Sequence, residues 1–157
     1  GVGPRFLNES FGMDNAQVLA KVTDKTRAVF LTHVLGYNGL TRGLLDELTA
    51  RRIPLIEDVC ESHGATFEGR KLGSIGRASN FSFYYAHHLS TIEGGMVCTD
   101  DTDLYEAVRM LRGHGMVREL SDAGRRAGYA AEFPDLNPDF IFAYPGFNVR
   151  STELNAI

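Results

Sequence analysis

Two adjacent histidines, His87 and His88, lie in a polar stretch between an aromatic run and a Gly-Gly pair. Imidazole gains and loses a proton near neutral pH, so a histidine placed there can act as an acid or a base. On extended chain, neighbouring side chains point to opposite faces, so both rings could not readily bind one ion. We therefore favour one histidine facing a cleft and the other packing away, rather than a metal site completed by Cys60, Glu61 or His63.

Asp58 ends a short apolar run that begins at Ile53. A carboxylate left unpaired in such a place would be costly. One interpretation is a local acceptor in a turn, where aspartate is common. The other is a carboxylate that keeps a heteroaromatic nitrogen protonated, because an opposite charge raises the pKa of that nitrogen and makes the ring a better electron sink. Both interpretations stay open on the residues alone.

Ser82 also has two interpretations, as a hydroxyl on the polar side of a strand or as a phosphate donor near a Gly-rich turn. The stretch around it predicts a strand, a polar elbow and a second strand. Aromatic residues from Phe81 to Tyr85 alternate with Ser82 and Tyr84, and apolar chain resumes at residues 96–98. Because loops carry function more often than the strands that support them, we expect a cofactor on the elbow.

Earlier in the chain, the pattern of strand, helix and strand predicts a βαβ unit. Residues 28–32 and 53–56 are continuous apolar runs, and residues 40–52 carry an amphipathic leucine stripe. Short joints between these elements imply parallel strands with a right-handed crossover. Ligands of such sheets bind at the carboxyl ends of the strands, where residues 32–33 and 57–58 fall.

Apolar spacing, caps and glycines predict five further elements. They are a helix from Met13 to near Thr23 capped by Asp14, a hairpin or turn over 67–76, a helix over 101–113, a solvated helix or lid over 121–132, and a helix start at 151–153. In the helix over 101–113, we expect Leu104, Val108 and Leu111 to face inward.

The composition is that of an ordinary globular protein. The chain has 157 residues with 43% hydrophobic content, enough for one domain with a core, and no apolar run of about 18 residues to span a membrane. A formal charge of −4 with interspersed signs argues against a nucleic-acid partner. With no secretory leader in view, Cys60 and Cys98 are interpreted as buried thiols in a reducing compartment, and a cytoplasmic location is expected.

Five motifs, in order, carry a resemblance to a known family, and it runs from about Thr26 to the end of the chain. They are EDVCESHGA (57–65), FSF (81–83), EGGMV (93–97), LRGHG (111–115) and GFNVRSTEL (146–154). The set resembles the DegT/DnrJ/EryC1/StrS family, which modifies nucleotide-linked sugars with pyridoxal phosphate (PLP) or pyridoxamine phosphate (PMP).

The resemblance implies an α/β fold, part of the large domain of an aspartate-aminotransferase-like (fold type I) enzyme. Its sheet is expected to be mixed and mostly parallel, with helices on both faces. A homodimer with shared active sites is implied as well. Residues 1–157 would be a partial PLP-binding domain that lacks the family's N-terminal phosphate-loop segment and its C-terminal small domain.

The resemblance also implies roles for individual residues. Asp58 would pair with the pyridine nitrogen, Glu61 would lie by the ring hydroxyl, and Ser82 would bind the cofactor phosphate. Asn148 would reach the phosphate of a neighbouring subunit. Candidate substrate contacts are His33, His88 and Arg150. As individual histidines, however, His33, His63 and His114 are interpreted as hydrogen-bonded structural residues rather than catalysts.

His87 is the departure that matters most. Aminotransferases of the family carry lysine six positions after Phe81, where this chain has His87, and its lysines are Lys21, Lys25 and Lys71. Imidazole cannot form the stable covalent link to the PLP aldehyde that lysine forms. The replacement resembles the family's sugar 3-dehydratases, which use PMP as a dissociable coenzyme and the histidine as base.

By that resemblance, His87 would remove a proton from C4′ of the cofactor and the C3 hydroxyl of a 4-keto sugar would leave as water, in polysaccharide or deoxysugar biosynthesis. Two alternatives stay open. One is a PLP-dependent sugar aminotransferase of the same family, and the other is a non-catalytic fragment or relative.

Overall fold

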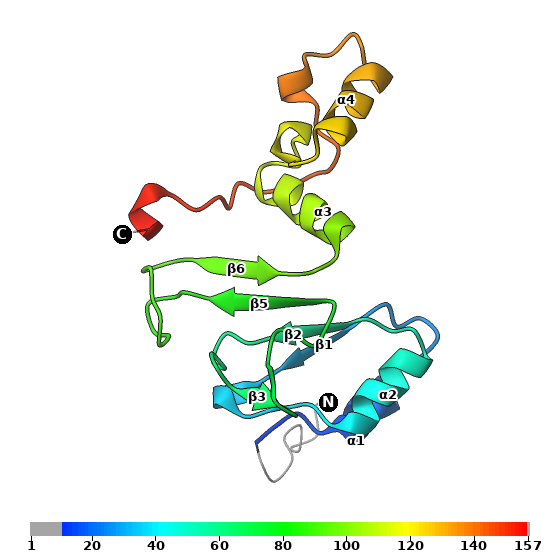
Figure 1. Ribbon diagram of the computed structural model, residues 1–157, viewed down its shortest axis with the longest axis vertical. Helices are drawn as coiled ribbons and strands as arrows, with labels where there is room; N and C mark the ends of the chain where they lie inside the picture. The colour runs from blue at the N-terminus through cyan, green and yellow to red at the C-terminus, as the bar shows by residue number, and fades with distance from the viewer. Residues whose placement is uncertain (1–10, 157) are drawn as a thin grey trace. The chain divides into compact units, whose positions relative to one another are not determined.

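The computed structural model describes residues 11–156, which fall into two compact units (Figure 1). Unit 1 ends at Thr99, and unit 2 begins at Asp100. Unit 1 contains the strands and two α-helices, and unit 2 is built mainly from helical segments. Within the described residues, no helix has both the length and the apolar character to cross a membrane.

The sheet of unit 1 has four strands among the described residues, in the order β1-β2-β5-β6 (Figure 1). β1 (Val29–Thr32), β2 (Leu55–Asp58) and β5 (Ala78–Ser82) are parallel, and β6 (Gly95–Cys98) is antiparallel to β5. The predicted βαβ unit and the mixed, mostly parallel sheet are confirmed. We call the side of the sheet where Thr32, Asp58 and Ser82 end their strands the carboxyl edge.

Both α-helices of unit 1 begin at a side chain that caps them. Asp14 accepts hydrogen bonds from the first turn of α1 (Asn15–Lys21), and Thr41 does so for α2 (Arg42–Ala50). Such caps are worth about 1 kcal/mol each, because they satisfy amide groups that have no partner inside the helix. The helix predicted from Met13 with an Asp14 cap is confirmed.

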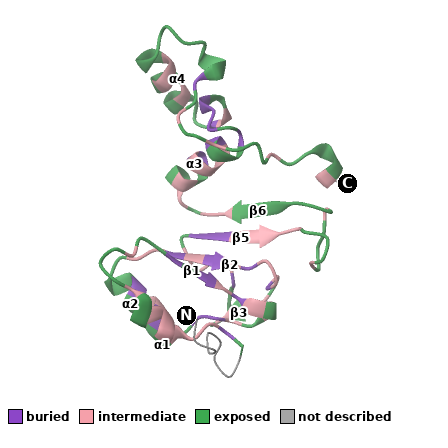
Figure 2. Cartoon of the chain, turned by 180° about the vertical axis from the view of Figure 1, so that it is seen from behind, coloured by how far each residue is buried: buried purple, intermediate pink, exposed green. Residues whose placement is uncertain are grey.

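Alternation along β1 decides which face of the sheet the helices cover. Val29 and Leu31 are buried, whereas Phe30 between them is 53% exposed. Leu44 and Leu48 of α2 belong to the same buried cluster, and side chains of α1 pack against it. In unit 1 the helices therefore lie on one face of the sheet (Figure 2), and the described residues of this unit include no second helical layer.

Two short segments complete unit 1. A 3-10 turn over Val34–Gly36 follows β1, and the hairpin β3 (Thr66–Phe67) with β4 (Arg70–Lys71) confirms the hairpin predicted over 67–76. The chain then enters β5 through the tight 72–76 turn, where Gly73 has a φ of +89°. A side chain at Gly73 would meet atoms of β5 at 3.1–3.2 Å, so the turn lies directly against that strand.

The predicted aromatic strand through Tyr85 is wrong, because β5 ends at Ser82. The next residue, Phe83, bonds instead to Gly94 and Thr91, and these two backbone bonds close a loop. Tyr85 is 67% exposed, so the aromatic alternation does not mark one buried face. We call residues 83–94, between β5 and β6, the elbow.

Unit 2 consists of helical segments joined by loops. They are α3 (Thr102–Arg112), a 3-10 turn over Val117–Glu119, α4 (Ala123–Glu132), a 3-10 turn over Pro138–Phe140 and one over Glu153–Ala156. α4 buries no residue, as the predicted solvated helix requires. The predicted inward face of α3 is wrong at Leu111, which is 41% exposed, because the buried positions of this helix are Glu106 and Met110.

The two cysteines are free thiols, and both are half-buried rather than fully buried as expected. Cys60 lies in the turn after β2, not inside a strand, and Cys98 ends β6. Burial, together with the adjacent Asp58 carboxylate, raises the pKa of the Cys60 thiol to about 11. Cys60 is therefore protonated at neutral pH and acts as a weak hydrogen-bonding group.

Candidate active site

Asp58 is held at the carboxyl edge by residues from both flanking strands. Its Oδ1 accepts from the backbone N–H of Cys60 at 3.2 Å and from Asn80 Nδ2 at 3.1 Å, and Oδ2 accepts from Thr32 Oγ1 at 3.3 Å. Thr32 and Asn80 are the register partners of Asp58 in β1 and β5. Burial alone would raise the pKa of Asp58, but hydrogen bonding from the Cys60 thiol, the Cys60 N–H, Asn80 and Thr32 outweighs it and lowers the pKa. The carboxylate is thus ionised. Because it accepts from the N–H of Cys60, it is also the local turn acceptor that the first interpretation of Asp58 proposed.

The neighbouring residue, Glu57, points to the opposite face of β2 and is completely buried. His33 is also completely buried, and its Nε2 lies 3.2 Å from the Glu57 carboxylate. The prediction that His33 contacts substrate is therefore wrong, because its ring has no solvent-facing surface. Its alternative interpretation, a hydrogen-bonded structural histidine, is confirmed.

Ser82 ends β5 and lies opposite Gly95 of β6. Its hydroxyl accepts a hydrogen bond from the backbone N–H of Tyr84 at 3.3 Å. A hydroxyl that accepts one bond still has its own proton to donate, which is what a phosphate oxygen requires. The structure thus places a suitable donor where the elbow leaves the carboxyl edge.

His87 lies in the elbow and is half-buried, not turned into the core. Its backbone N–H donates to Tyr84 O at 3.0 Å, and its ring lies edge-on to the Tyr84 ring with centroids 6.0 Å apart. His88 is exposed, so the expectation that it packs away is wrong.

Glu61 lies in the segment after β2 and is half-buried. Its Oε2 accepts from the backbone N–H of Leu35 at 2.7 Å, which ties the loop after β1 to the loop after β2. Leu35 has a φ of +53°, a left-handed conformation that costs energy for a residue with a side chain, and this hydrogen bond helps to hold it. A role beside the ring hydroxyl stays a prediction.

Asn148 and Arg150 lie in unit 2, in a segment whose backbone hydrogen-bonds to the end of α3. Asn148 forms an isolated bridge with Gly113, and Arg150 Nη1 lies 2.9 Å from Glu119 Oε1. A side chain at Gly115 or Gly146 would overlap backbone atoms of the opposite segment. The LRGHG and GFNVRSTEL motifs therefore form one structure in unit 2. The phosphate and substrate contacts expected of these two residues stay predictions.

A model of the DegT/DnrJ/EryC1/StrS aminotransferase family matches residues 6–157. The chain belongs to this family. It is 34% identical over 146 residues to GDP-4-keto-6-deoxy-D-mannose 3-dehydratase of Escherichia coli O55:H7, covering 93% of this chain and 37% of the relative. It is also 33% identical over 147 residues to GDP-perosamine synthase of Caulobacter vibrioides, covering 94% of this chain and 35% of the relative.

Among solved structures, the chain resembles E. coli GDP-4-keto-6-deoxy-D-mannose 3-dehydratase with bound hydrated PLP. The TM-score is 0.78 with 32% sequence identity, and the match covers 98% of this chain and 39% of the other. The predicted fold, part of the large domain of a fold type I enzyme, is confirmed. The chain spans under two fifths of the length of each of these relatives.

This member of the DegT/DnrJ/EryC1/StrS family has contacts at the carboxyl edge that its sequence alone did not predict. Asn80 was not singled out, and Thr32 and Glu57 were expected to fall at the carboxyl ends of their strands but were given no individual role. The parallel register of the three strands could have paired Thr32 and Asn80 with Asp58. Asn80 Oδ1 and His63 Nε2 are buried atoms with no hydrogen-bond partner among the described residues. Buried polar atoms are normally hydrogen-bonded, so these two atoms are available to bond to a ligand at the carboxyl edge.

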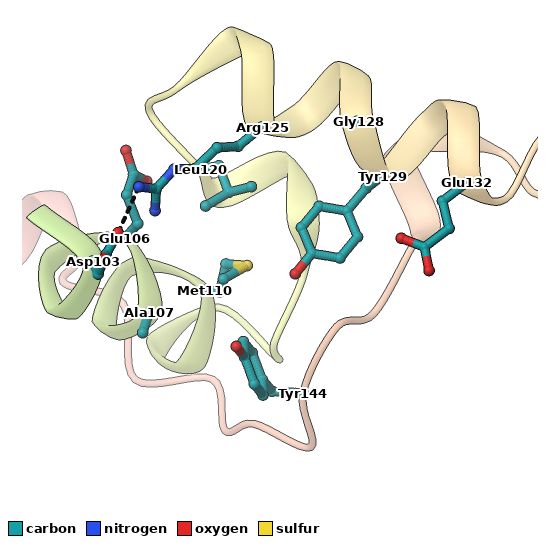
Figure 3. A pocket seen from close by; sticks show the side chains of 10 residues that line it. All are labelled: Asp103, Glu106, Ala107, Met110, Leu120, Arg125, Gly128, Tyr129, Glu132 and Tyr144. Atoms are coloured by element: carbon teal, nitrogen blue, oxygen red, sulfur yellow. Dashed lines mark hydrogen bonds and ion pairs between the residues drawn. The ribbon is translucent and has the colours of Figure 1, made fainter.

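The other clusters of charged residues in this family member are less suited to catalysis or to binding a ligand. Unit 2 contains a pocket of about 520 Å³, lined by α3, α4 and Tyr144 (Figure 3). Three of its charged groups already have partners: Arg125 pairs with Asp103, and the Glu106 carboxylate accepts from the backbone N–H of Ser121 at 2.8 Å. Within residues 11–156, no group of three or more His, Cys, Asp or Glu is arranged to hold a metal ion.

Proposed function

We propose that this chain is part of a PMP-dependent 3-dehydratase acting on a 4-keto nucleotide-linked sugar, in polysaccharide or deoxysugar biosynthesis. The observation that carries the proposal is His87, a half-buried imidazole in the elbow, at the position where aminotransferases of the family carry lysine. The similarity to a GDP-4-keto-6-deoxy-D-mannose 3-dehydratase supports the same reaction.

Residues of the carboxyl edge suit such a cofactor. When bound, PMP supplies an amine that reacts with the sugar ketone and a ring that accepts electrons. Asp58, kept ionised by its three hydrogen-bond donors, holds a proton on the ring nitrogen. Ser82 would donate its hydroxyl to the phosphate, and Glu61 would lie by the ring hydroxyl. Asn148 reaches the phosphate bound in the other subunit of a homodimer.

His87 is the base of the proposed reaction. It would accept a proton from C4′ of the bound cofactor and return that proton to the C3 hydroxyl of the sugar, which would then leave as water. A positioned general base contributes about 10²–10⁴-fold to a reaction rate. His88, exposed beside it, and Arg150, oriented by Glu119, are the proposed contacts to the nucleotide sugar.

A trapping experiment on the full-length enzyme tests this proposal. The wild type should bind PMP reversibly, and borohydride should not attach PLP covalently to any lysine. Incubation with PMP and GDP-4-keto-6-deoxymannose should yield a sugar that lacks the C3 oxygen, detected by mass spectrometry. A His87→Lys variant should allow covalent trapping and lose the dehydration. Covalent trapping on the wild type would overturn the dehydratase proposal.

The alternative is a sugar aminotransferase, and the similarity to GDP-perosamine synthase favours it. Against it stands the absence of lysine at position 87; Lys71 lies in β4 and donates to the Gly64 carbonyl at 3.1 Å. A 4-amino sugar product from the wild-type enzyme would establish this alternative. We also propose a cytoplasmic location, which is consistent with two free thiols.

A further inference from the structure

A buried carboxylate lies directly behind the proposed ring-binding acid. Glu57 and Asp58 are consecutive in β2, so their side chains point to opposite faces of the sheet. We propose that Glu57, together with His33, positions Asp58 for its contact with a bound cofactor ring, an inference that rests on the function proposed above. Glu57 acts through the backbone and touches neither cofactor nor substrate.

Both oxygens of Glu57 are fully used. Oε1 accepts from the backbone N–H groups of Ile75 at 2.8 Å and Gly76 at 2.6 Å, and Oε2 accepts from Gly73 N at 2.9 Å and from His33 Nε2. Hydrogen bonds of this kind are what a completely buried carboxylate needs, since each donor offsets the loss of water. The 72–76 turn is therefore wrapped around one side chain.

His33 is fixed at both ring nitrogens. The backbone N–H of Gly39 donates to Nδ1 at 3.0 Å, so the proton of the neutral ring is on Nε2 and points at Glu57. Gly39 can approach this closely because it has no side chain: a Cβ there would lie 2.8 Å from Leu31. Ser62 also donates to the His33 carbonyl at 2.6 Å. The pair thus joins the ends of β1 and β2.

The same turn connects Glu57 to the contacts of Asp58. Ser79 Oγ in β5 donates to the Gly73 carbonyl at 2.7 Å, which ties the turn to the strand that carries Asn80. The Asp58 carbonyl accepts from His33 N at 3.0 Å, and Asn80 donates to the Asp58 carboxylate. A shift of the 72–76 turn would therefore move the donors on both sides of Asp58.

A Glu57→Gln substitution removes this arrangement at constant size. Whichever way the amide is turned, its NH₂ group faces two donors where the carboxylate had two acceptor positions. The matched control is Glu106→Gln, which replaces another buried carboxylate that accepts several hydrogen bonds, but in unit 2. Both variants lose stability, so stability alone does not separate positioning from packing.

The test uses the full-length enzyme and PMP labelled with ¹⁵N at the ring nitrogen. The ¹⁵N chemical shift reports protonation of that nitrogen, and a titration gives the Kd of PMP. We expect a protonated nitrogen in the wild type and in Glu106→Gln. Glu57→Gln should bind PMP about tenfold more weakly, the scale of one lost hydrogen bond to a charged group, with a smaller protonated fraction.

Asp58→Asn separates the two proposals. If it loses ring protonation while Glu57→Gln matches the wild type, the inference on Glu57 is overturned and the proposed function stands. If the wild type itself does not hold the nitrogen protonated, the proposed function fails, and the inference with it. Should Glu57→Gln not fold, Ser79→Ala removes the link between the turn and β5, and an unchanged ¹⁵N shift in that variant overturns the inference.

Discussion

The carboxyl edge of the sheet and the elbow carry the two halves of the proposed chemistry, and they are built differently. Asp58 at the edge receives hydrogen bonds from β1, β5 and its own turn. The elbow is closed at its base by two backbone bonds of Phe83, and beyond them Tyr85 is 67% and Ile92 75% exposed. The acid is therefore positioned by strand register, and the base by a local turn.

Because of this difference, substitutions in the two regions should affect folding stability and catalysis to different degrees. A change at the carboxyl edge disturbs residues that also hold the strands together, so it should affect both folding and cofactor binding. A change in the elbow removes few contacts of the core and should affect catalysis more than folding.

The largest effect is expected at His87. A His87→Asn substitution should lower kcat for dehydration by about 10²–10⁴-fold, because the base proposed to take the C4′ proton is lost. The melting temperature should hardly change, since substitutions at sites with few contacts alter stability by about 0.5 kcal/mol or less. His88→Asn is the neighbouring comparison and should raise KM for the nucleotide sugar more than it lowers kcat. Equal loss of kcat in both variants would contradict the assignment.

Asp58→Asn should weaken PMP binding by about ten- to hundredfold, the scale of a lost charged hydrogen bond. It should also lower the melting temperature, unlike His87→Asn, because Thr32 and Asn80 lose a charged acceptor. Isothermal titration with PMP and a thermal melt of the same samples measure both. A variant that binds PMP as the wild type does would remove Asp58 from the cofactor site.

Acid should destabilise the edge through Glu57. Burial would raise the pKa of Glu57, but His33 and the 73–76 amides together lower it below the ordinary value. A carboxyl with a lowered pKa in the folded state stabilises the fold above its unfolded pKa, about 4.3, and that contribution is lost as the pH falls through the folded value. Urea unfolding between about pH 6 and pH 3 should show this loss, and Glu57→Gln should show less of it. Parallel curves would contradict the prediction.

Much of the fold follows from the sequence for simple physical reasons. The runs at 28–32 and 53–56 are apolar without a break, and the helix between them has a leucine stripe. Two parallel strands covered by that helix are the arrangement that buries both apolar runs. Asp14 and Asp101 cap the helices that they were expected to cap or begin. Asp58 could be located because it ends such a strand.

Other features depend on contacts that no local pattern contains. Glu57 and Asp58 look alike in the sequence, and what distinguishes them is a turn 16–19 residues later that supplies three amides to Glu57. The end of β5 at Ser82 is set by the pairing of Phe83 with Gly94 and Thr91, whereas the aromatic alternation favours a longer strand. Burial of His33 likewise depends on Glu57, which lies 24 residues further along the chain, and on the close approach of Gly39.

The smallest effect is expected at Gly94, where the elbow joins β6. A Cβ at this position would lie 2.3 Å from Thr91 Oγ1 and 3.4 Å from Phe83 Cβ. Gly94→Ala should therefore shift the elbow, at a cost of about 1 kcal/mol, the lower range for overpacking. Because His87 lies in this loop, kcat should fall several-fold while PMP affinity, set at the carboxyl edge, stays unchanged.

The double variant Thr91→Ala/Gly94→Ala sharpens this prediction, since removal of the Thr91 hydroxyl removes the clash. Stability should then rise above that of Gly94→Ala, and kcat should recover in part. Gly95→Ala is the matched control inside β6, where the nearest atom to a new Cβ is the Phe81 carbonyl oxygen at 3.2 Å. That substitution presses on the strand pair that ends in Ser82, so it should weaken PMP binding rather than kcat. If Gly94→Ala weakened PMP binding and spared kcat, the elbow and the carboxyl edge would not be separable, and positioning of the base would have to come from the sheet.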